Sequence, residues 1–181
     1  LLATLGGFLI YSDLEFFLHE GKLIGYSSLI ESEAGSEDFQ RKIKSLLLVG
    51  SIIFTCSILI FYFAGIRKSK KQQVEFWNPS MIRALKSLFI PVLAGGIFSI
   101  VLIMHGYVGM IAPSTLIFYG LGLINASKYT YGEIEVLGYV QLILGLIASF
   151  FMGSGLLFWV IGFGFCHIVF GIIFYLRHDA K

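Results

Sequence analysis

The chain alternates between long apolar runs and short polar stretches, and the apolar runs have the length needed to cross a bilayer. The clearest run, residues 45–66, holds 22 residues without a charged side chain. As an α-helix it would be about 33 Å long, enough for a hydrocarbon core about 30 Å thick. Similar runs follow at roughly 80–105, 111–126, 134–152 and 156–176. The pattern therefore predicts five complete membrane helices.

A further apolar run opens the sequence. Residues 1–11 contain no charged side chain, yet as a helix they span only about 17 Å, too little to cross a bilayer alone. We interpret this run as the end of a first membrane helix rather than of a signal peptide, because no basic segment or small-residue cleavage pattern accompanies it. The expected fold is an all-α, polytopic transmembrane helical bundle of about six helices. It forms a single transmembrane domain over residues 1–181, with the first helix truncated at its N-terminus.

Proline and glycine mark the borders of several helices. Asn78 followed by Pro79 is typical of an N-cap with proline in the first helical turn. Pro91 falls inside the same helix, where it removes a backbone donor and predicts a kink. Residues 153–155, with the sequence Gly-Ser-Gly, predict a tight turn before the last helix.

The composition indicates a membrane protein. Hydrophobic residues make up 57% and charged residues 13% of the chain, and the mean hydropathy is +0.86. Soluble domains are about 45–50% apolar and about 25% charged. Cys56 and Cys166 both lie inside apolar runs, which disfavours a disulfide framework or a metal site. We expect no metal and no cofactor.

Acidic and basic residues are unevenly distributed. Residues 12–43 carry seven of the eleven acids, interleaved with aromatic and aliphatic side chains, which predicts a partly amphipathic segment on the membrane surface. One side of the predicted membrane carries nine basic residues: Arg67, Lys68, Lys70, Lys71, Arg83, Lys86, Lys128, Arg177 and Lys181. The other side carries four, which are Lys22, Arg41, Lys42 and Lys44.

Cytoplasmic loops of membrane proteins are enriched in Lys and Arg. We therefore expect a basic cytoplasmic loop over 67–83, a cytoplasmic C-terminus and an external acidic segment over 12–43. The basic run has an alternative interpretation as a patch for anionic lipid or nucleic acid. Because the orientation rule already explains the run, we expect no nucleic-acid partner.

Small residues recur at helical spacing and predict close helix packing. The predicted packing positions are Gly95 and Ser99 in the third segment, Gly122 and Ala126 in the fourth, Gly145, Ser149 and Gly153 in the fifth, and Gly164 and Gly171 in the sixth. We expect most of these faces to be used within the bundle. One face would remain for a second copy or for other membrane subunits.

His167 is the only ionisable side chain well inside an apolar segment, and such residues are functional candidates. Counting from the cytoplasmic end places it roughly 13 Å deep, and Gln141 on the neighbouring antiparallel segment roughly 10 Å deep. We expect the two residues to meet across the turn at 153–155. One interpretation is a neutral histidine that is hydrogen-bonded to Gln141 or to a backbone carbonyl. The other is a ligand, proton or substrate site.

Other candidate chemistry is limited. Asn125 is a candidate cap of the fourth segment and Lys128 a partner for its helix dipole, with an anion or headgroup site as the alternative. His19 and His105 do not match the depth of His167, so a haem held by two histidines is not expected. The chain contains no P-loop, H-E-x-x-H, CxxC or G-x-S-x-G motif. We expect no catalytic residue and no enzymatic activity.

The second half of the chain contains distinctive strings. They are FYGL at 118–121, NASKYT at 125–130 and GSGLLFW at 153–159, followed by His167 and Gly171. Over roughly residues 78–178 the chain resembles an uncharacterised family of small multi-pass inner-membrane proteins of Bacteroidota. The resemblance implies a bacterial inner membrane and no particular activity. That family has an acidic residue where this chain has Gln141, a difference that disfavours proton movement at this position.

Two functional hypotheses follow. The first is a non-enzymatic accessory or scaffold subunit, or a homo-oligomer, packed through small-residue helix faces. The second is a small carrier, channel or sensor that uses a polar site around His167 and Gln141. The lipid bilayer is the surrounding partner in both.

Overall fold

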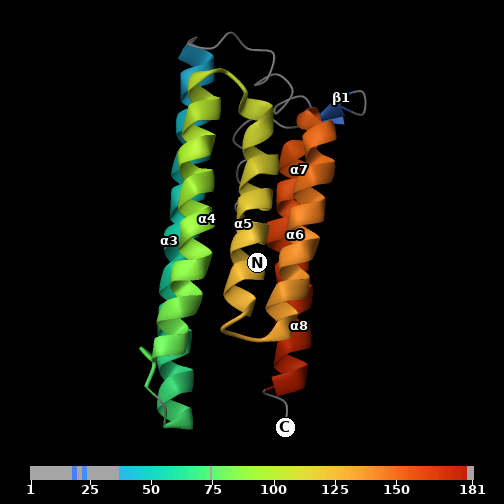
Figure 1. Ribbon diagram of the computed structural model, residues 1–181. Coiled ribbons are helices and arrows are strands. Elements are labelled where there is room, and N and C mark those ends of the chain that lie inside the picture. The colour runs from blue at the N-terminus through green and yellow to red at the C-terminus, as the bar shows by residue number, and fades with distance from the viewer. Residues whose placement is uncertain (1–17, 20–21, 24–36, 74, 179–181) are drawn as a thin grey trace.

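The computed structural model describes residues 18–19, 22–23, 37–73 and 75–178 (Figure 1). Nearly all of these residues are helical, and five helical spans are long and apolar enough to cross a membrane. The predicted all-α, polytopic bundle is confirmed. The expected first helix over 1–11 and most of the acidic segment lie outside the described residues.

The helices follow one another as antiparallel rods. Four are α-helices: α3 Glu37–Gln72, α4 Pro79–Met104, α5 Ile111–Ser127 and α6 Gly132–Phe150. The last rod has three parts: α7 Gly155–Trp159, the π-helix η3 Val160–Cys166 and α8 His167–His178. Short connecting elements complete the chain: η1 Val108–Met110, η2 Met152–Ser154, and the antiparallel pair β1 Leu18–His19 and β2 Lys22–Leu23.

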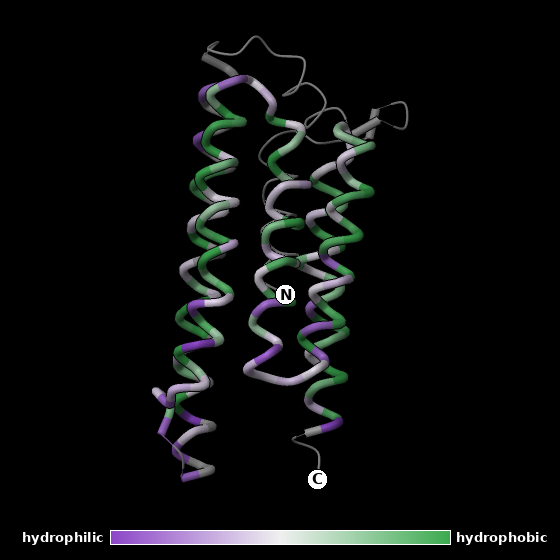
Figure 2. Tube along the Cα trace, viewed as in Figure 1, coloured by the Kyte–Doolittle hydropathy of each residue, from purple (hydrophilic) through white to green (hydrophobic). Residues whose placement is uncertain are grey.

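Because successive rods run in opposite directions, alternate connections lie at the same end of the bundle. The connection after α3, the connection after α5 and the end of α8 all lie at the lower end of Figure 1. Figure 2 shows apolar residues along the rods and hydrophilic residues gathered at the lower ends of α3 and α4. The helix ends and connection that carry the basic segment 67–71, Arg83, Lys86, Lys128 and Arg177 therefore share one end of the described fold.

The basic segment at 67–83 differs from its prediction as a loop. α3 continues through the basic run to Gln72, and α4 begins at Pro79, so the connection is only 73–78. Lys, Arg and Gln are good helix formers, and water can satisfy the last carbonyl groups as α3 leaves the apolar span. Charge marks where the membrane ends on this helix, but it does not mark where the helix ends.

The start of α4 has the predicted cap. The Asn78 side chain accepts a hydrogen bond from the backbone N–H of Met81 over 2.8 Å, and Pro79 occupies the first turn. Pro91 lies inside α4, and the helix continues on both sides of it.

α5 lies at the centre of the bundle. Half of the span Val108–Ser127 is buried within the protein, against 28% of Gly132–Phe150 and 11% of Pro79–Met104. α5 contacts α4, α6 and α7. The outer helices carry many exposed Ile, Leu and Phe side chains, as lipid-facing helices do.

Glycines bring α4 and α5 into close contact. A Cβ at Gly122 would lie 2.9 Å from the carbonyl oxygen of Leu88, and one at Gly95 would lie 2.5 Å from the Cβ of Phe118. Ala126, one turn beyond Gly122, is also buried. These small side chains allow the two helices to approach more closely than larger ones would.

α5 and α6 meet backbone to backbone. A Cβ at Gly120 would lie 2.7 Å from the carbonyl oxygen of Gly138, and one at Gly138 would lie 2.9 Å from the carbonyl oxygen of Gly120. Gly145 makes a similar contact, 2.9 Å from the backbone nitrogen of Ile117. Ser149 donates to the carbonyl oxygen of Gly145 in its own helix over 3.0 Å. The Gly120 and Gly138 pair was not predicted, because neither residue has a second small residue four positions away.

Not every predicted packing glycine is used within the chain. Nothing in the described part of the chain lies within 4 Å of a Cβ built at Gly153 or Gly171. Gly153 is exposed in η2 and Gly171 is exposed on α8, whereas Gly164 is buried in η3. Gly153 and Gly171 therefore leave open positions on the surface of the bundle.

The last rod is less regular than its sequence suggests. The predicted turn at 153–155 corresponds to the 3₁₀ turn η2, and the segment at 156–176 is helical throughout. Its middle, however, is a seven-residue π-helix. A π-helix has i→i+5 hydrogen bonds and is wider than an α-helix. The residues of a long apolar run carry no signal for this register, so it was not predicted.

Candidate functional site

His167 begins α8, directly after the π-helix, and both of its ring nitrogens have a partner. Nδ1 lies 2.9 Å from the carbonyl oxygen of Gly162, and Nε2 lies 2.9 Å from the hydroxyl oxygen of Tyr119 on α5. A carbonyl oxygen can only accept, so the contact with Gly162 assigns the proton to Nδ1. Nε2 of the neutral ring then accepts from the Tyr119 hydroxyl. The histidine is satisfied as a neutral group.

Gln141 on α6 donates to the same carbonyl oxygen. The residue is 0% exposed, and its Nε2 lies 2.7 Å from the Gly162 oxygen. This nitrogen is also 3.4 Å from Nδ1 of His167, which carries a proton and cannot accept. Rotating the Gln141 amide by half a turn would place its Oε1 against the Gly162 carbonyl oxygen. The Gly162 carbonyl therefore fixes the orientation of the Gln141 amide. Tyr119, Gln141, Gly162 and His167 together form what we call the polar cluster.

The oxygen of the Gln141 amide is the one unsatisfied member of this cluster. Oε1 is buried and has no hydrogen-bond partner among the described residues. A Cβ built at Gly162 would lie 2.6 Å from Oε1 and 2.5 Å from Cδ2 of Leu116. The glycine hydrogen on this side points towards the oxygen, as in the weak Cα–H···O contacts found between helices. Only glycine permits this approach.

The π-helix places the histidine over its acceptor. In an α-helix the carbonyl of residue i accepts from the N–H of residue i+4, whereas in a π-turn the partner is residue i+5. His167 is five residues after Gly162, the spacing of one π-turn. Its side-chain ring contacts the Gly162 carbonyl oxygen through Nδ1. The Gly162 carbonyl can in turn accept from Gln141 on the neighbouring helix. π-turns are frequent at functional sites, which makes this turn the best candidate in the described part of the chain.

Aromatic rings pack around the histidine. The His167 ring is stacked on Tyr119 with centroids 5.5 Å apart, and on Phe163 with centroids 5.8 Å apart. Phe163 also contacts Tyr119 at 5.0 Å and Trp159 at 5.1 Å. Large aromatic surfaces of this kind shield the hydrogen bonds from the surrounding membrane. The polar cluster is therefore a hydrogen-bonded part of the bundle interior.

The structure brings together two of the four polar residues that the sequence singled out. His167 and Gln141 lie side by side, as their depths predicted. Asn125 and Lys128 are exposed at the C-terminal end of α5, and neither is among the hydrogen-bonding partners of the polar cluster. Tyr119 was missed, because a tyrosine within an aromatic-rich apolar run has no distinctive spacing.

A second group of contacts joins α8 to the start of α6 at the lower end of the bundle. Arg177 donates to the Glu133 carboxylate over 2.8 Å, with the Arg177 side chain 67% exposed and that of Glu133 18% exposed. Next to this ion pair the rings of Tyr131 and Phe174 meet edge to face, with centroids 5.0 Å apart. An exposed ion pair and an aromatic contact thus help to hold the end of the last rod against α6.

The described residues offer no arrangement for metal chemistry. None of their His, Cys, Asp and Glu side chains form a group of three or more that could hold a metal ion. Comparisons with known protein families, with curated proteins and with solved structures found no match.

Proposed function

We propose that this chain is a non-enzymatic integral membrane protein of the bacterial inner membrane that acts as an accessory subunit or as a homo-oligomer. The observation that carries the proposal is the open position at Gly171 on α8. The neighbouring side chains of Ile168, Ile172 and Tyr175 are exposed, so this face of α8 is uncovered by the described residues. A glycine among large apolar side chains allows a second membrane helix to approach closely.

The closed polar cluster supports the absence of catalysis. Gln141 is fully buried, and His167 uses both ring nitrogens in hydrogen bonds to Tyr119 and Gly162. A general acid or base must be within hydrogen-bond reach of its substrate. In this arrangement the protein's own groups occupy those positions.

We further propose that the lower end of the bundle in Figure 1 faces the cytoplasm. The exposed basic residues at that end are Arg67, Lys70, Arg83, Lys86, Lys128 and Arg177. Loops and helix ends that are rich in Lys and Arg usually lie on the cytoplasmic side of a membrane. A fluorescent-protein fusion to the C-terminus should be active in the cytoplasm. Activity of a C-terminal periplasmic phosphatase fusion instead would reverse the orientation.

Gly171→Leu tests the interaction face. The new side chain enters open space in the described part of the chain, so we expect the variant to fold as the wild type does. It should lose self-association, or lose its co-purifying membrane subunit, when measured by cross-linking in native membranes and by native mass spectrometry in a mild detergent.

Gly132→Leu is the matched control, because Gly132 is also exposed with nothing among the described residues within 4 Å of its Cβ position. It should leave the assembly intact. A wild-type chain that is monomeric and co-purifies with no other subunit would contradict the proposal. So would an assembly that Gly171→Leu leaves unchanged.

The π-helix favours a second candidate function, a small sensor or carrier that works through His167. Protonation of Nε2 would turn this atom from an acceptor into a donor and force the Tyr119 hydroxyl to find a new acceptor. Imidazole ¹⁵N chemical shifts, followed between about pH 5 and pH 8 in reconstituted protein, test this function. Shifts that change together with the Tyr119 resonance support it, and shifts that stay constant exclude a proton-linked role.

A further inference from the structure

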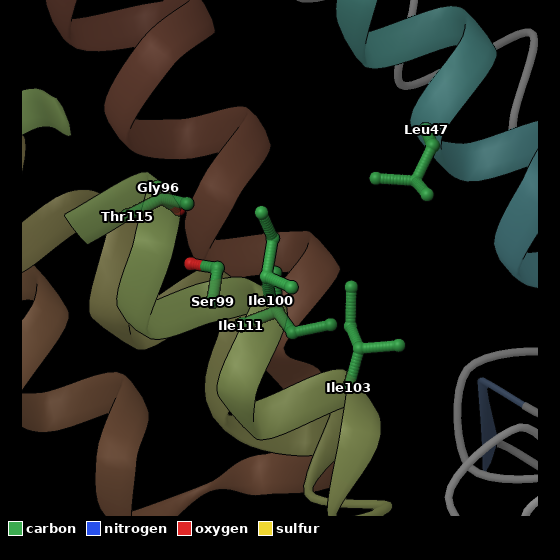
Figure 3. A pocket seen from close by; sticks show the side chains of 7 residues that line it. All are labelled: Leu47, Gly96, Ser99, Ile100, Ile103, Ile111 and Thr115. Carbon is green, nitrogen blue, oxygen red and sulfur yellow. The ribbon is translucent and has the colours of Figure 1, made fainter. Parts of the chain in front are cut away.

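A cavity of about 340 Å³ lies between α3, α4 and α5. Leu47 of α3 forms one wall, and Gly96, Ile100 and Ile103 of α4 form another, while Ile111 of α5 contributes to the third. Figure 3 shows Ile100 and Ile103 directed towards Leu47 across the gap. Small-molecule pockets typically have volumes of about 300–1,000 Å³, so the cavity is large enough for part of a ligand.

The lining of this cavity offers no free hydrogen-bond donor. Its two polar residues are Ser99 and Thr115. The Ser99 hydroxyl donates to the Gly95 carbonyl oxygen over 2.8 Å, and the Thr115 hydroxyl donates to the Ala112 carbonyl oxygen over 2.8 Å. The rest of the lining is glycine and aliphatic side chains. A polar ligand would lose its hydrogen bonds to water here and could regain only those that the two hydroxyl oxygens accept, so the lining favours hydrocarbon.

The cavity lies in the apolar part of the bundle, beside the ends of three candidate membrane spans. Its α4 residues belong to the candidate span Pro79–Met104, and its α5 residues belong to Val108–Ser127. On α3, Leu47 lies three residues before the span Gly50–Arg67. Around such spans the apolar molecules are lipid acyl chains.

A positive charge stands above the cavity on α3. Lys44 lies three residues before Leu47, so the two side chains share one face of the helix and Lys44 is about 4.5 Å nearer the end of the rod. Lys44 is exposed and forms no ion pair in the described part of the chain. A cation beside the water and an apolar cavity below it complement a lipid, with its phosphate at the surface and its chains in the core.

We propose that the cavity between α3, α4 and α5 holds one acyl chain of a phospholipid whose phosphate binds Lys44. The acyl chain fills the space opposite Gly96, where no side chain reaches. At the other end of the α3–α4 pair the Phe76 ring packs against Gly65 of α3. The lipid therefore fastens the upper half of α3 to the bundle. This site is separate from the Gly171 face and from the polar cluster.

Native mass spectrometry of the full chain tests the proposal. The protein is extracted in a mild detergent, washed, and supplied with palmitoyl-oleoyl phosphatidylglycerol as the probe. We expect the wild type to retain one phospholipid per chain. Gly96→Leu places a side chain in the cavity and should abolish this retention. Lys44→Gln should weaken it roughly fivefold, the effect of removing one cation near a lipid phosphate.

Gly132→Leu is the control, because it adds the same side chain at an open glycine outside the cavity and outside the Gly171 face. It should retain the phospholipid as the wild type does. Ile100→Trp fills the cavity from another position and replaces Gly96→Leu if that variant does not fold, as judged by circular dichroism. Equal retention by the wild type and the cavity-filling variants overturns the proposal. Loss of retention in Gly132→Leu as well, or a dimer that Gly96→Leu dissociates, also overturns it.

Discussion

The side-chain nitrogen of Gln141 on α6 lies 2.7 Å from the carbonyl oxygen of Gly162 in the π-helix. This contact fixes the last rod against its neighbour at one position along the helix axes. In a bilayer no water is at hand to replace either partner, so the two groups depend on each other. The carbonyl oxygen that receives this bond is also the acceptor for His167.

Gln141→Leu should lower the unfolding free energy by about 1 kcal/mol, the usual size of an interhelical hydrogen bond in a membrane protein. The loss is modest because the substitution also removes the buried Oε1 atom that lacks a partner. Unfolding in mixed detergent micelles, followed by circular dichroism, measures the effect. Asn125→Leu, at an exposed position, is the control and should change the stability little. Equal stabilities of Gln141→Leu and the wild type would show that the hydrogen bond contributes nothing.

Gly162→Ala should destabilise the protein by roughly 1–3 kcal/mol, the range for inserting a methyl group into a filled interior. The added Cβ would lie 2.5 Å from Leu116 Cδ2 and 2.6 Å from the Gln141 oxygen. Thermal unfolding in the same detergent compares this variant with Gly171→Ala, whose Cβ enters open space. A melting temperature for Gly162→Ala as high as that of Gly171→Ala would argue against the close contact.

His167 should carry its proton on Nδ1 at neutral pH. The reason is geometric, because the Gly162 carbonyl oxygen beside Nδ1 can only accept and the Tyr119 hydroxyl beside Nε2 can donate. Solid-state ¹⁵N spectra of labelled protein distinguish the two neutral forms of the ring. Tyr119→Phe removes the donor and should shift the Nε2 resonance while Nδ1 remains protonated. A proton on Nε2 in the wild type would contradict the assignment.

Arg177→Gln should cost about 0.2–1 kcal/mol of unfolding free energy, the range of exposed ion pairs. The Arg177 side chain is 67% exposed, so solvent and salt screen its interaction with Glu133. Chemical unfolding at low and at high salt measures the effect, and the difference between wild type and variant should shrink as salt is added. Arg177→Lys keeps the charge and should retain most of the stability. A difference that is independent of salt would mean that the side chain acts through packing instead.

The five complete membrane helices and their order could be predicted because long apolar runs have to match the thickness of a bilayer. The run at 45–66 and the cap formed by Asn78 and Pro79 are examples of such local signals. The end of α3 could not be predicted in the same way. The helix extends beyond the apolar run to Gln72, because the basic residues in this stretch are good helix formers and are also stable in water.

The candidate site was predictable only in part. A histidine and a glutamine at matching depth on adjacent helices are visible in the sequence, and the structure places His167 and Gln141 together. The contact of Tyr119 with His167 and the π-helical register depend on how three helical rods pack against one another, and no local sequence pattern encodes this packing. The backbone contact between Gly120 and Gly138 was missed because neither glycine has a second small residue four positions away on its own helix.

The close contacts of the bundle also differ in the length of chain that separates their partners. Glycine contacts join α4 to α5 and α5 to α6, and the bond from Gln141 to Gly162 joins residues only 21 positions apart. Contacts between neighbours in the chain form quickly, because little chain has to be ordered before they close. The hydrogen bond between Tyr119 and His167 joins residues 48 positions apart, and the whole of α6 lies between them in the sequence. It can close only when the last rod has docked, so the environment of His167 reports the completion of folding.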